Sequence, residues 1–184
     1  MNKALLIIDV QNAFNDPKWG NRNNHIAEYN IRHLLSVWRK NNHEVIFIQH
    51  TSKNHDSVFH PENEGFLIKE IVRPREDERV ITKEVNSAFI GTNLEEHLIN
   101  QKVKEIVITG LTTPHCVSTT TRMSGNLGYK TYLISDATAA FGVYDNNKQY
   151  FDAQTVHDIS LATIHNEFAT VLSTEEYIES YLKK

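Results

Sequence analysis

The stretch Ala4-Leu5-Leu6-Ile7-Ile8-Asp9, near the start of the chain, decides the fold. Five apolar residues in a row, without polar alternation, are typical of a strand that is buried on both faces, as in a parallel sheet. The run stops at a carboxylate. Five further strand patterns follow along the chain, at residues 45–48, 80–82, 106–109, 131–135 and 169–172. The sequence therefore predicts a mainly parallel sheet of about six strands.

Helical patterns separate these strands. Between residues 26 and 40, apolar side chains recur at the spacing of one helical face, at Ile31, Leu34, Leu35 and Trp38. Further helices are predicted to begin at the capping-box sequence 92–95, at Pro114, near residue 147 and at Ser173. Alternating strands and helices indicate a sheet that is covered by helices on both faces. We therefore predict an α/β protein with a three-layer α/β/α, Rossmann-like fold.

The composition is that of an ordinary globular protein. A chain of 184 residues suits one domain with a full core, and we take residues 1–184 as that domain. The net charge is −4 and no basic stripe is present, so a nucleic acid is not expected as a partner. The apolar runs are shorter than a membrane span, and the first residues lack a signal-peptide pattern. One cysteine cannot form an internal disulfide, so we expect a cytoplasmic protein without a membrane partner.

Three reactive residues follow three of the predicted strands: Asp9, Lys83 and Cys116. In an open parallel sheet, ligands bind beyond the carboxyl ends of the strands, where the strand order reverses. We therefore expect the three side chains at one edge of the sheet. Singly, they could be a cap, a solvated lysine and a small buried thiol. Together they can activate a nucleophile, because Asp9 can accept the thiol proton and Lys83 can stabilise the thiolate.

Cys116 lies between the strand pattern 106–109 and a helix pattern. We predict it in the first turn of the helix, where the helix N-terminus favours negative charge and lowers the pKa of a thiol. The neighbouring His115 projects about 100° away around the helix, which makes a Cys–His pair awkward. We therefore assign His115 to the lining of a substrate pocket or to packing.

These motifs resemble those of the isochorismatase-like cysteine hydrolases. The matching sequences are LIIDVQNAF (6–14), KEVNSAF (83–89) with Thr92 and Leu94, and GLTTPHCV (110–117). The three motifs occur in order and span about the whole chain. The superfamily contains nicotinamidases, N-carbamoylsarcosine amidases, ureidoacrylate hydrolases and isochorismatases. Residues 112–127 and 136–139 resemble its streptothricin-hydrolase-like branch.

The resemblance implies a role for each reactive residue: Asp9 as the base, Lys83 as the stabilising cation and Cys116 as the nucleophile. It also implies an oxyanion hole built from the backbone N–H groups of Thr112 and Cys116, with a cis peptide bond between Leu111 and Thr112. Hydrolysis of a C–N bond of the amide type in a small molecule, through a thioester, is the expected reaction. A homodimer or larger homo-oligomer is the expected assembly.

Aromatic residues near the motifs are candidate walls of the substrate pocket. Phe14 and Trp19 lie in the loop after the first strand, and Phe89 follows Lys83. Members of the resembled family use aromatic residues near such places to sandwich flat substrates. Tyr144, in the loop after the fifth strand, is a weaker candidate. The irregular stretch 50–79 is long enough to be a binding loop or a lid.

No metal and no cofactor are predicted. Nicotinamidases carry a metal site in the loop after the second strand, with an Asp-x-His pattern and a further histidine. Here the aspartate is missing, although His50, His55 and His60 remain and three histidines can bind zinc or iron. Loops also collect solvated histidines, and we interpret these three in that way.

Two alternatives to amide hydrolysis stay open from the sequence. An isochorismatase cleaves a vinyl ether and needs no cysteine, so the presence of Cys116 favours amide hydrolysis over it. A catalytically idle scaffold of the same fold is the second alternative. The retention of Asp9, Lys83 and Cys116 argues against that alternative. The sequence does not identify the substrate.

Overall fold

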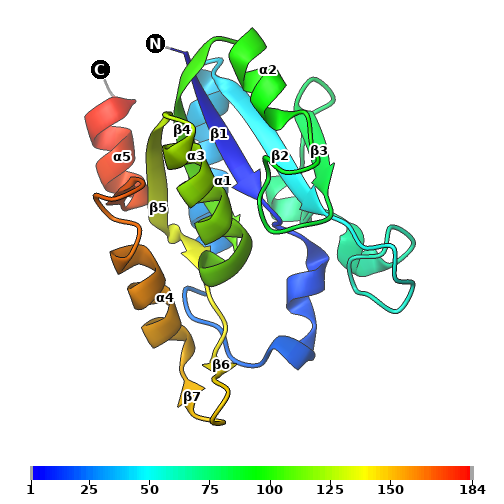
Figure 1. Ribbon diagram of the computed structural model, residues 1–184. Coiled ribbons are helices and arrows are strands. Elements are labelled where there is room, and N and C mark those ends of the chain that lie inside the picture. The colour runs from blue at the N-terminus through cyan, green and yellow to red at the C-terminus, as the bar shows by residue number, and fades with distance from the viewer. Residues whose placement is uncertain (1, 183–184) are drawn as a thin grey trace.

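The computed structural model describes residues 2–182, and its centre is one six-stranded sheet. All neighbouring strands run parallel, in the order β3-β2-β1-β4-β5-β8 (Figure 1). The strands of this sheet are β1 (Asn2–Ile8), β2 (Glu44–His50), β3 (Arg79–Lys83), β4 (Val103–Leu111), β5 (Lys130–Ala139) and β8 (Thr170–Leu172). A short antiparallel hairpin, β6 (Val143–Tyr144) and β7 (Tyr150–Phe151), projects beyond it.

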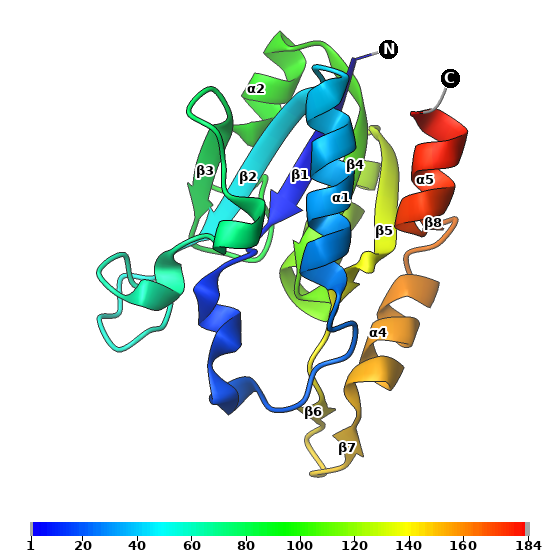
Figure 2. The ribbon, with the colours of Figure 1, turned by 180° about the vertical axis from the view of Figure 1, so that it is seen from behind.

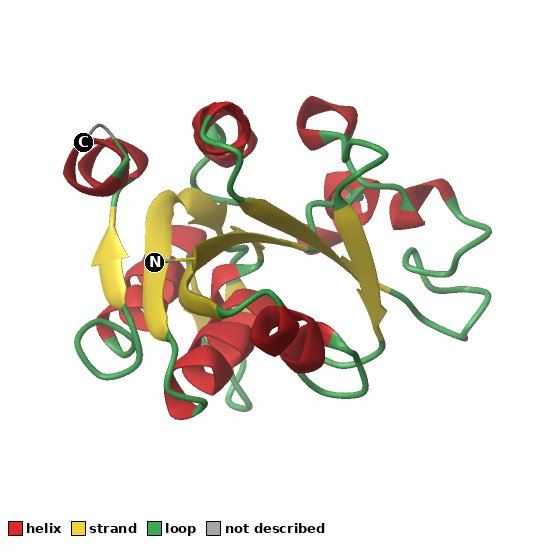
Figure 3. Cartoon of the chain, turned by 90° about the horizontal axis from the view of Figure 1, so that it is seen from above, coloured by secondary structure: helices red, strands yellow, loops and turns green. Residues whose placement is uncertain are grey.

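Helices cover both faces of the sheet, which confirms the predicted three-layer arrangement (Figure 3). α1 (Ala27–Lys40) and α5 (Thr174–Tyr181) lie on the face seen in Figure 2. α2 (Leu94–Asn100) and α3 (Ser118–Asn126) lie on the opposite face (Figure 1). α4 (Ala153–Ala162) contacts β5 and the turn that precedes α3. None of the helices in residues 2–182 is long and apolar enough to traverse a bilayer.

The apolar run of β1 is buried on both faces, as predicted. Leu6 and Ile8 belong to the hydrophobic cluster that includes residues of α2, whereas Leu5 and Ile7 belong to the cluster on the α1 side. All four side chains are at most 1% exposed. The strand alternates between two cores rather than between core and solvent, because it lies in the middle of the sheet.

Some local predictions were wrong. The helix predicted over 147–165 begins only at Ala153, where the Asp152 carboxylate accepts hydrogen bonds from two backbone N–H groups. Residues 143–151 instead form the β6–β7 hairpin. The capping box predicted at 92–95 does not form, because the helix begins at Leu94 with Asn93 as its N-cap, so Thr92 lies one residue too early. At the last helix, Ser173 and Glu176 do form one.

The chain path creates a crevice at the middle of the sheet. β1, β2 and β3 follow one another toward one edge, and β4, β5 and β8 toward the other, so the strand order reverses between β1 and β4. The segments after β1 and β4 therefore leave the sheet in different directions. A ligand site is expected beyond the carboxyl ends of these two strands.

Candidate active site

Four polar side chains meet at the carboxyl edge of the sheet, each from a different strand. Asp9 follows β1, His50 ends β2, Lys83 ends β3, and Cys116 lies in the wide turn Thr113–Val117 after β4. Because these strands are parallel neighbours, their ends share one edge. The predicted convergence of Asp9, Lys83 and Cys116 is therefore observed, and His50 joins them.

The Lys83 ammonium is the centre of this cluster. Its Nζ lies 2.7 Å from Asp9 Oδ2, 3.2 Å from Cys116 Sγ and 3.1 Å from His50 Nδ1. The Lys83 and Asp9 side chains are 0% and 1% exposed. A lysine has three donor protons, so these three contacts match its hydrogen-bonding capacity. Lys83 thus holds the carboxylate and the sulfur on either side of one buried positive charge.

The backbone aims the Asp9 carboxylate into the crevice. Asp9 has a positive φ of 50° and donates its N–H to Ile48 O at 2.9 Å, so the chain turns as β1 ends. One carboxylate oxygen, Oδ2, binds Lys83. The other, Oδ1, is buried and has no hydrogen-bond partner among the described residues. That oxygen is the one with a vacant acceptor site, and it can take up a proton.

Burial raises the pKa of both the Asp9 carboxyl group and the Cys116 thiol. It raises the pKa of Asp9 above its ordinary value, and the charge of Lys83 opposes the shift. Burial also raises the pKa of the Cys116 thiol to about 12, with a further contribution from the Asp9 charge. The predicted lowering of the thiol pKa at a helix N-terminus was therefore wrong. The resting state at neutral pH is a thiol beside a carboxylate whose proton affinity is increased.

His50 is the fourth member of the cluster, and its imidazole is neutral. Burial and the neighbouring Lys83 charge lower the pKa of His50 to about 4. Since Nδ1 accepts from the Lys83 ammonium, the ring proton is on Nε2. The ring packs edge-on against Phe59, with 5.0 Å between centroids. The side chain of Gln11 fixes the His50 backbone: its amide N–H donates to His50 O, and its amide oxygen accepts from the His50 N–H.

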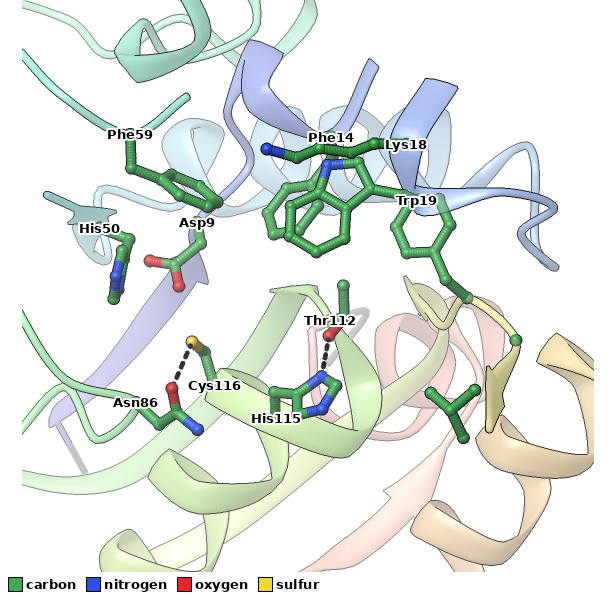
Figure 4. A pocket seen from close by; sticks show the side chains of 13 residues that line it. Asp9, Phe14, Lys18, Trp19, His50, Phe59, Asn86, Thr112, His115 and Cys116 are labelled. Carbon is green, nitrogen blue, oxygen red and sulfur yellow. Dashed lines mark hydrogen bonds between the residues drawn. The ribbon is translucent and has the colours of Figure 1, made fainter. Parts of the chain in front are cut away.

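The turn that carries Cys116 is held by polar contacts on both of its sides. The peptide bond between Leu111 and Thr112 is cis, as the resemblance implied. The Thr112 hydroxyl lies 3.0 Å from His115 Nδ1, which directs the His115 ring away from the sulfur (Figure 4). On the other side, the buried Thr113 hydroxyl lies 2.9 Å from Nδ1 of His157 on α4. His115 and Cys116 therefore do not form a pair.

A cavity of about 410 Å³ opens above this cluster (Figure 4). Its lining comes from five parts of the chain: Asp9, Phe14, Lys18, Trp19, His50, Phe59, Asn86, Thr112, His115, Cys116, Phe141, Gly142 and Val143. The sulfur of Cys116 and the carboxylate of Asp9 face one another across its floor. The cavity thus gives a small molecule access to a thiol and a carboxylate together.

Aromatic rings form the walls of the cavity. Phe14 lies 5.4 Å from Trp19, 5.5 Å from Phe59 and 6.1 Å from Phe141, measured between ring centroids. The indole N–H of Trp19 donates to Ala13 O at 2.8 Å, which fixes the ring orientation. Such walls suit a flat, largely apolar ligand. The structure thus brings Phe14, Trp19 and His115 to the cavity, where the sequence predicted them.

Two predicted wall residues lie elsewhere. Phe89 is in the hydrophobic core and stacks on Tyr129, with 6.3 Å between centroids, because the segment after β3 folds back over the sheet. Tyr144 is 70% exposed on the β6–β7 hairpin, where it packs on Tyr150. Neither side chain lines the cavity.

Sequence reasoning missed His50, Phe59, Asn86 and Phe141 as cavity residues. A signal was present for His50, since it ends a predicted strand just as Lys83 does. Asn86 is three residues after Lys83, and its Oδ1 lies 3.7 Å from Cys116 Sγ. Phe59 and Phe141 carried no signal, because their places depend on the paths of long loops.

The three histidines considered for a metal divide into two groups. His50 shares the buried cluster with Asp9 and Cys116, whose ligand atoms lie within 4.8 Å of one another. His55 and His60 lie in the loop after β2, with 4.1 Å between their ring centroids, and both approach Glu62. His60 is only 9% exposed, so of the three histidines only His55 is solvated as predicted. The three histidines therefore do not offer one common ligand set.

Comparison with known proteins identifies the family. The sequence matches the isochorismatase domain family over residues 3–176. It is 64% identical over 181 residues to YrdC of Bacillus subtilis, an uncharacterized isochorismatase family protein, covering 98% of this chain and 97% of that one. This chain belongs to the isochorismatase family.

Solved and named members of the family agree with the fold. A hydrolase-class member of the isochorismatase family from Chromobacterium violaceum is 37% identical, with a TM-score of 0.95 over 97% of this chain and 93% of its own. Nicotinamidase 3 of Arabidopsis thaliana is 27% identical, covering 97% of this chain and 88% of that one. Streptothricin hydrolase of Streptomyces noursei is 28% identical, over 77% and 56% of the two chains. The chain is thus an isochorismatase-like hydrolase, as its three motifs indicated.

Proposed function

We propose that this isochorismatase-family protein is a metal-independent cysteine hydrolase that cleaves a C–N bond of the amide type in a small molecule. The observation that carries the proposal is the Lys83 ammonium between Asp9 Oδ2, at 2.7 Å, and Cys116 Sγ, at 3.2 Å, below an aromatic cavity. A nucleophile, a base and a fixed positive charge are the parts that acyl transfer needs.

The attack begins from the thiol form of Cys116. Since burial raises the pKa of both the thiol and Asp9, the proton passes from Sγ to Asp9 as the sulfur attacks the substrate carbonyl carbon. Oδ1, which has no other hydrogen-bond partner among the described residues, is the acceptor. The carbonyl oxygen becomes an oxyanion, and the backbone N–H groups of Thr112 and Cys116 stabilise it.

In the remaining steps, Asp9 donates a proton twice, first to the leaving nitrogen and then to the sulfur. Asp9 donates it to the leaving nitrogen, the C–N bond breaks, and an amine or ammonia leaves while the acyl group stays on Cys116 as a thioester. A water molecule then attacks the thioester carbonyl and gives a proton to Asp9. The C–S bond breaks, the acid product leaves, and the proton returns to the sulfur. The Lys83 ammonium stays in place through these steps, because it contacts Asp9, His50 and Cys116.

The position of Lys83 supports the metal-independent form of the proposal. Asp9, His50 and Cys116 would be a reasonable ligand set for a transition metal. Their ligand atoms, however, already surround an ammonium with 0% side-chain exposure. A metal ion would have to displace this buried charge, which pairs with Asp9.

The amide preference is supported by two features. A cysteine nucleophile is useful for acyl transfer and unnecessary for the cleavage of a vinyl ether. Among the relatives, Nicotinamidase 3 carries an amidase activity in its name. We further propose that the enzyme acts in the cytoplasm, where its single thiol stays reduced, and as a homo-oligomer, which light scattering after gel filtration would measure.

A hydrolysis screen tests the reaction. Small amides, ureides and isochorismate are incubated with the wild type, Cys116→Ala and Cys116→Ser, and ammonia, amine and pyruvate are measured. Amine or ammonia release that both variants lose, with an acyl adduct on Cys116 in the intact mass of the wild type, is the expected result. Pyruvate release from isochorismate would indicate the vinyl ether reaction, and full turnover by Cys116→Ala would overturn the thioester mechanism. An unmodified protein without turnover on any probe would favour an idle scaffold.

A further inference from the structure

The charges that face the cavity are unevenly matched. Among the described residues that line it, Asp9 and Lys18 carry formal charges. The Asp9 charge is offset by Lys83 at 2.7 Å. Burial lowers the pKa of both lining histidines, His50 and His115, so they are neutral at neutral pH. Lys18 is thus the charged lining group that lacks an opposite charge at hydrogen-bond distance, since the Asp16 carboxylate is 3.9 Å from its Nζ.

Lys18 has a fixed backbone and an extended side chain. It lies in the short 3₁₀-helix Pro17–Trp19, which Asp16 caps by accepting a hydrogen bond from the Lys18 N–H at 2.9 Å. Its ammonium lies 5.1 Å from the centroid of the Trp19 ring. Figure 4 shows the side chain running along the roof of the cavity, with Nζ between Phe59 and Trp19 and on the opposite side from Cys116. The charge therefore faces the outer end of a bound molecule.

The space between this ammonium and the sulfur is lined by rings. Phe14, Trp19, Phe59 and Phe141 surround it, and the polar lining groups other than Asp9 and Lys18 are neutral. A flat, apolar body fits such walls. An anionic group at the outer end of that body would meet Lys18, whereas a cationic group there would meet the like charge of Lys18.

We propose that Lys18 determines specificity, and that the substrate is a small, flat amide that carries a carboxylate at the end remote from the scissile bond. The inference rests on the proposed hydrolysis at Cys116 and adds the substrate class. Lys18 touches only the remote carboxylate, so it contributes to binding and not to the bond-breaking steps.

Three matched probes test this preference: 4-carbamoylbenzoate, benzamide and 4-(aminomethyl)benzamide, which differ in the charge opposite the amide. The wild type should prefer the carboxylate over the neutral probe in kcat/KM by about fivefold, the scale of a partly exposed ion pair. The cationic probe should be the poorest of the three. Raising the ionic strength to about 0.5 M should reduce the preference, since salt screens a charge at a cavity mouth.

Variants assign the preference to Lys18. Lys18→Met should remove it mainly through a higher KM for 4-carbamoylbenzoate, with kcat little changed, and Lys18→Arg should keep it. Lys104→Met is the matched control, because Lys104 is exposed in β4 near the amino end of that strand and its replacement changes the net charge equally. Equal kcat/KM for the three probes, or an undiminished preference in Lys18→Met, would overturn the proposal.

A binding measurement separates this proposal from the proposed reaction. Titration calorimetry on Cys116→Ala compares the three probes without turnover. Tighter binding of 4-carbamoylbenzoate that is lost in Cys116→Ala/Lys18→Met supports the role of Lys18 even if the wild type hydrolyses none of the probes. Hydrolysis of all three probes without any charge preference supports the reaction and contradicts the role of Lys18. Binding of none of the probes by Cys116→Ala would contradict this substrate class.

Discussion

Lys83 connects the reactive groups, since its ammonium contacts a carboxylate, an imidazole and a sulfur at once. The Asp9 carboxylate and the Lys83 ammonium have opposite effects on the pKa of the thiol. The Asp9 charge raises the pKa of Cys116 and the Lys83 charge lowers it, both after the larger effect of burial. Removing the Asp9 charge should therefore raise the reactivity of the thiol but lower turnover, whereas removing the Lys83 charge should lower both.

Asp9→Asn should have opposite effects on two reactions of the Cys116 sulfur, namely substrate hydrolysis and alkylation by iodoacetamide. Loss of the base should reduce hydrolysis by about 100-fold or more. Loss of the negative charge should lower the pKa of Cys116 and increase its alkylation by iodoacetamide at pH 8. Lys83→Met should reduce both rates.

Mass spectrometry measures the label directly, because Cys116 is the single cysteine of the chain. Cys116→Ser provides the unlabelled baseline, and circular dichroism checks that each variant is folded. Slower labelling of Asp9→Asn than of the wild type would contradict the electrostatic account of the cluster.

His50 should act through Lys83. His50→Leu leaves the third ammonium proton without an acceptor in a buried site, which costs about 1–3 kcal/mol. We expect kcat to fall by about tenfold or more, and His50→Gln, which can still accept a hydrogen bond, to recover part of it. Steady-state kinetics of the two variants measure this difference. Equal losses in both variants would indicate that only the shape of the ring matters.

At the scale of elements, β4 packs against the backbone of β1 just before the turn that carries Cys116, at Gly110. Gly110 has a φ of 122°, and a Cβ placed there would clash with Ile8 O and lie 2.6 Å from Ile8 N. The absence of a side chain allows β4 to lie against the end of β1. This contact sets the distance between the segments that hold Asp9 and Cys116.

Gly110→Ala should prevent folding or lower stability by about 3 kcal/mol or more, because backbone atoms cannot move aside. Gly91→Ala is the control. Gly91 also has a positive φ, of 69°, but no atom lies within 4 Å of the added Cβ. It should cost only about 1–2 kcal/mol of backbone strain. Urea denaturation compares the two, and similar losses would argue against a specific clash.

Glu28 joins three segments around the cavity. Its carboxylate binds Arg22 at 2.8 and 2.7 Å and Lys69 at 2.7 Å, so it ties the loop before α1 and the segment after the 50–66 loop to the helix. Burial opposes ionisation, yet the two cations lower the pKa of Glu28 to about 2. The folded state therefore favours the ionised carboxylate.

This shift makes stability depend on pH in acid. A carboxyl group whose pKa is lower in the folded state contributes fully above its unfolded pKa of 4.5 and loses that contribution as the pH falls toward 2. The contribution is on the order of 3 kcal/mol. Glu28→Gln should lower the Tm at pH 7 and weaken the further loss between pH 4.5 and 2. A variant with an unchanged acid profile would show that other carboxyl groups dominate.

Elements with a strong hydrophobic pattern could be predicted, and those without one could not. The runs at 4–8 and 45–48 and the helix over 26–40 were found because each buries a continuous apolar surface. The β6–β7 hairpin was missed because it is largely exposed and carries little pattern. Capping by Ser173 was correct, whereas the helix predicted to begin at Thr92 takes Asn93 as its N-cap.

Across the whole molecule, the reactive residues lie at one end of the sheet and a separate group of stabilising residues lies at the other. The cavity is at the carboxyl ends of the strands, whereas α5 lies beside the other end of the sheet (Figure 1). There Tyr177 of α5 is fully buried, stacks on Trp38 and donates to Glu105 Oε1 at 2.8 Å. A change at this end should alter stability without altering the chemistry.

Tyr177→Ala should lower the unfolding free energy by about 4 kcal/mol and the Tm by about 10 °C, because it leaves a large cavity and removes the hydroxyl that donates to the Glu105 carboxylate. Calorimetry measures the Tm, and turnover at 15 °C should stay near that of the wild type. Tyr144→Ala is the control, since Tyr144 is 70% exposed and its loss should leave the Tm nearly unchanged. A large loss of turnover in folded Tyr177→Ala would contradict this separation.

The same separation explains what the sequence could reveal about the site. Asp9, Lys83 and Cys116 could be predicted because strand ends are fixed by the parallel sheet. Phe59, Phe141 and Lys18 could not be placed, because loop paths bring them together. The pKa of Cys116 was predicted in the wrong direction, since burial outweighs the helix terminus and depends on the completed fold.

The aromatic walls and the reactive floor have separate origins in the chain. Phe14, Phe59 and Phe141 come from three loops, whereas Asp9 and Lys83 are anchored where strands stop. Substitutions in evolution can therefore change the loop phenylalanines and Lys18 one at a time, while Asp9, Lys83 and Cys116 stay in place. A mutant library restricted to these loop positions should yield variants with altered substrate specificity and an unchanged reaction mechanism.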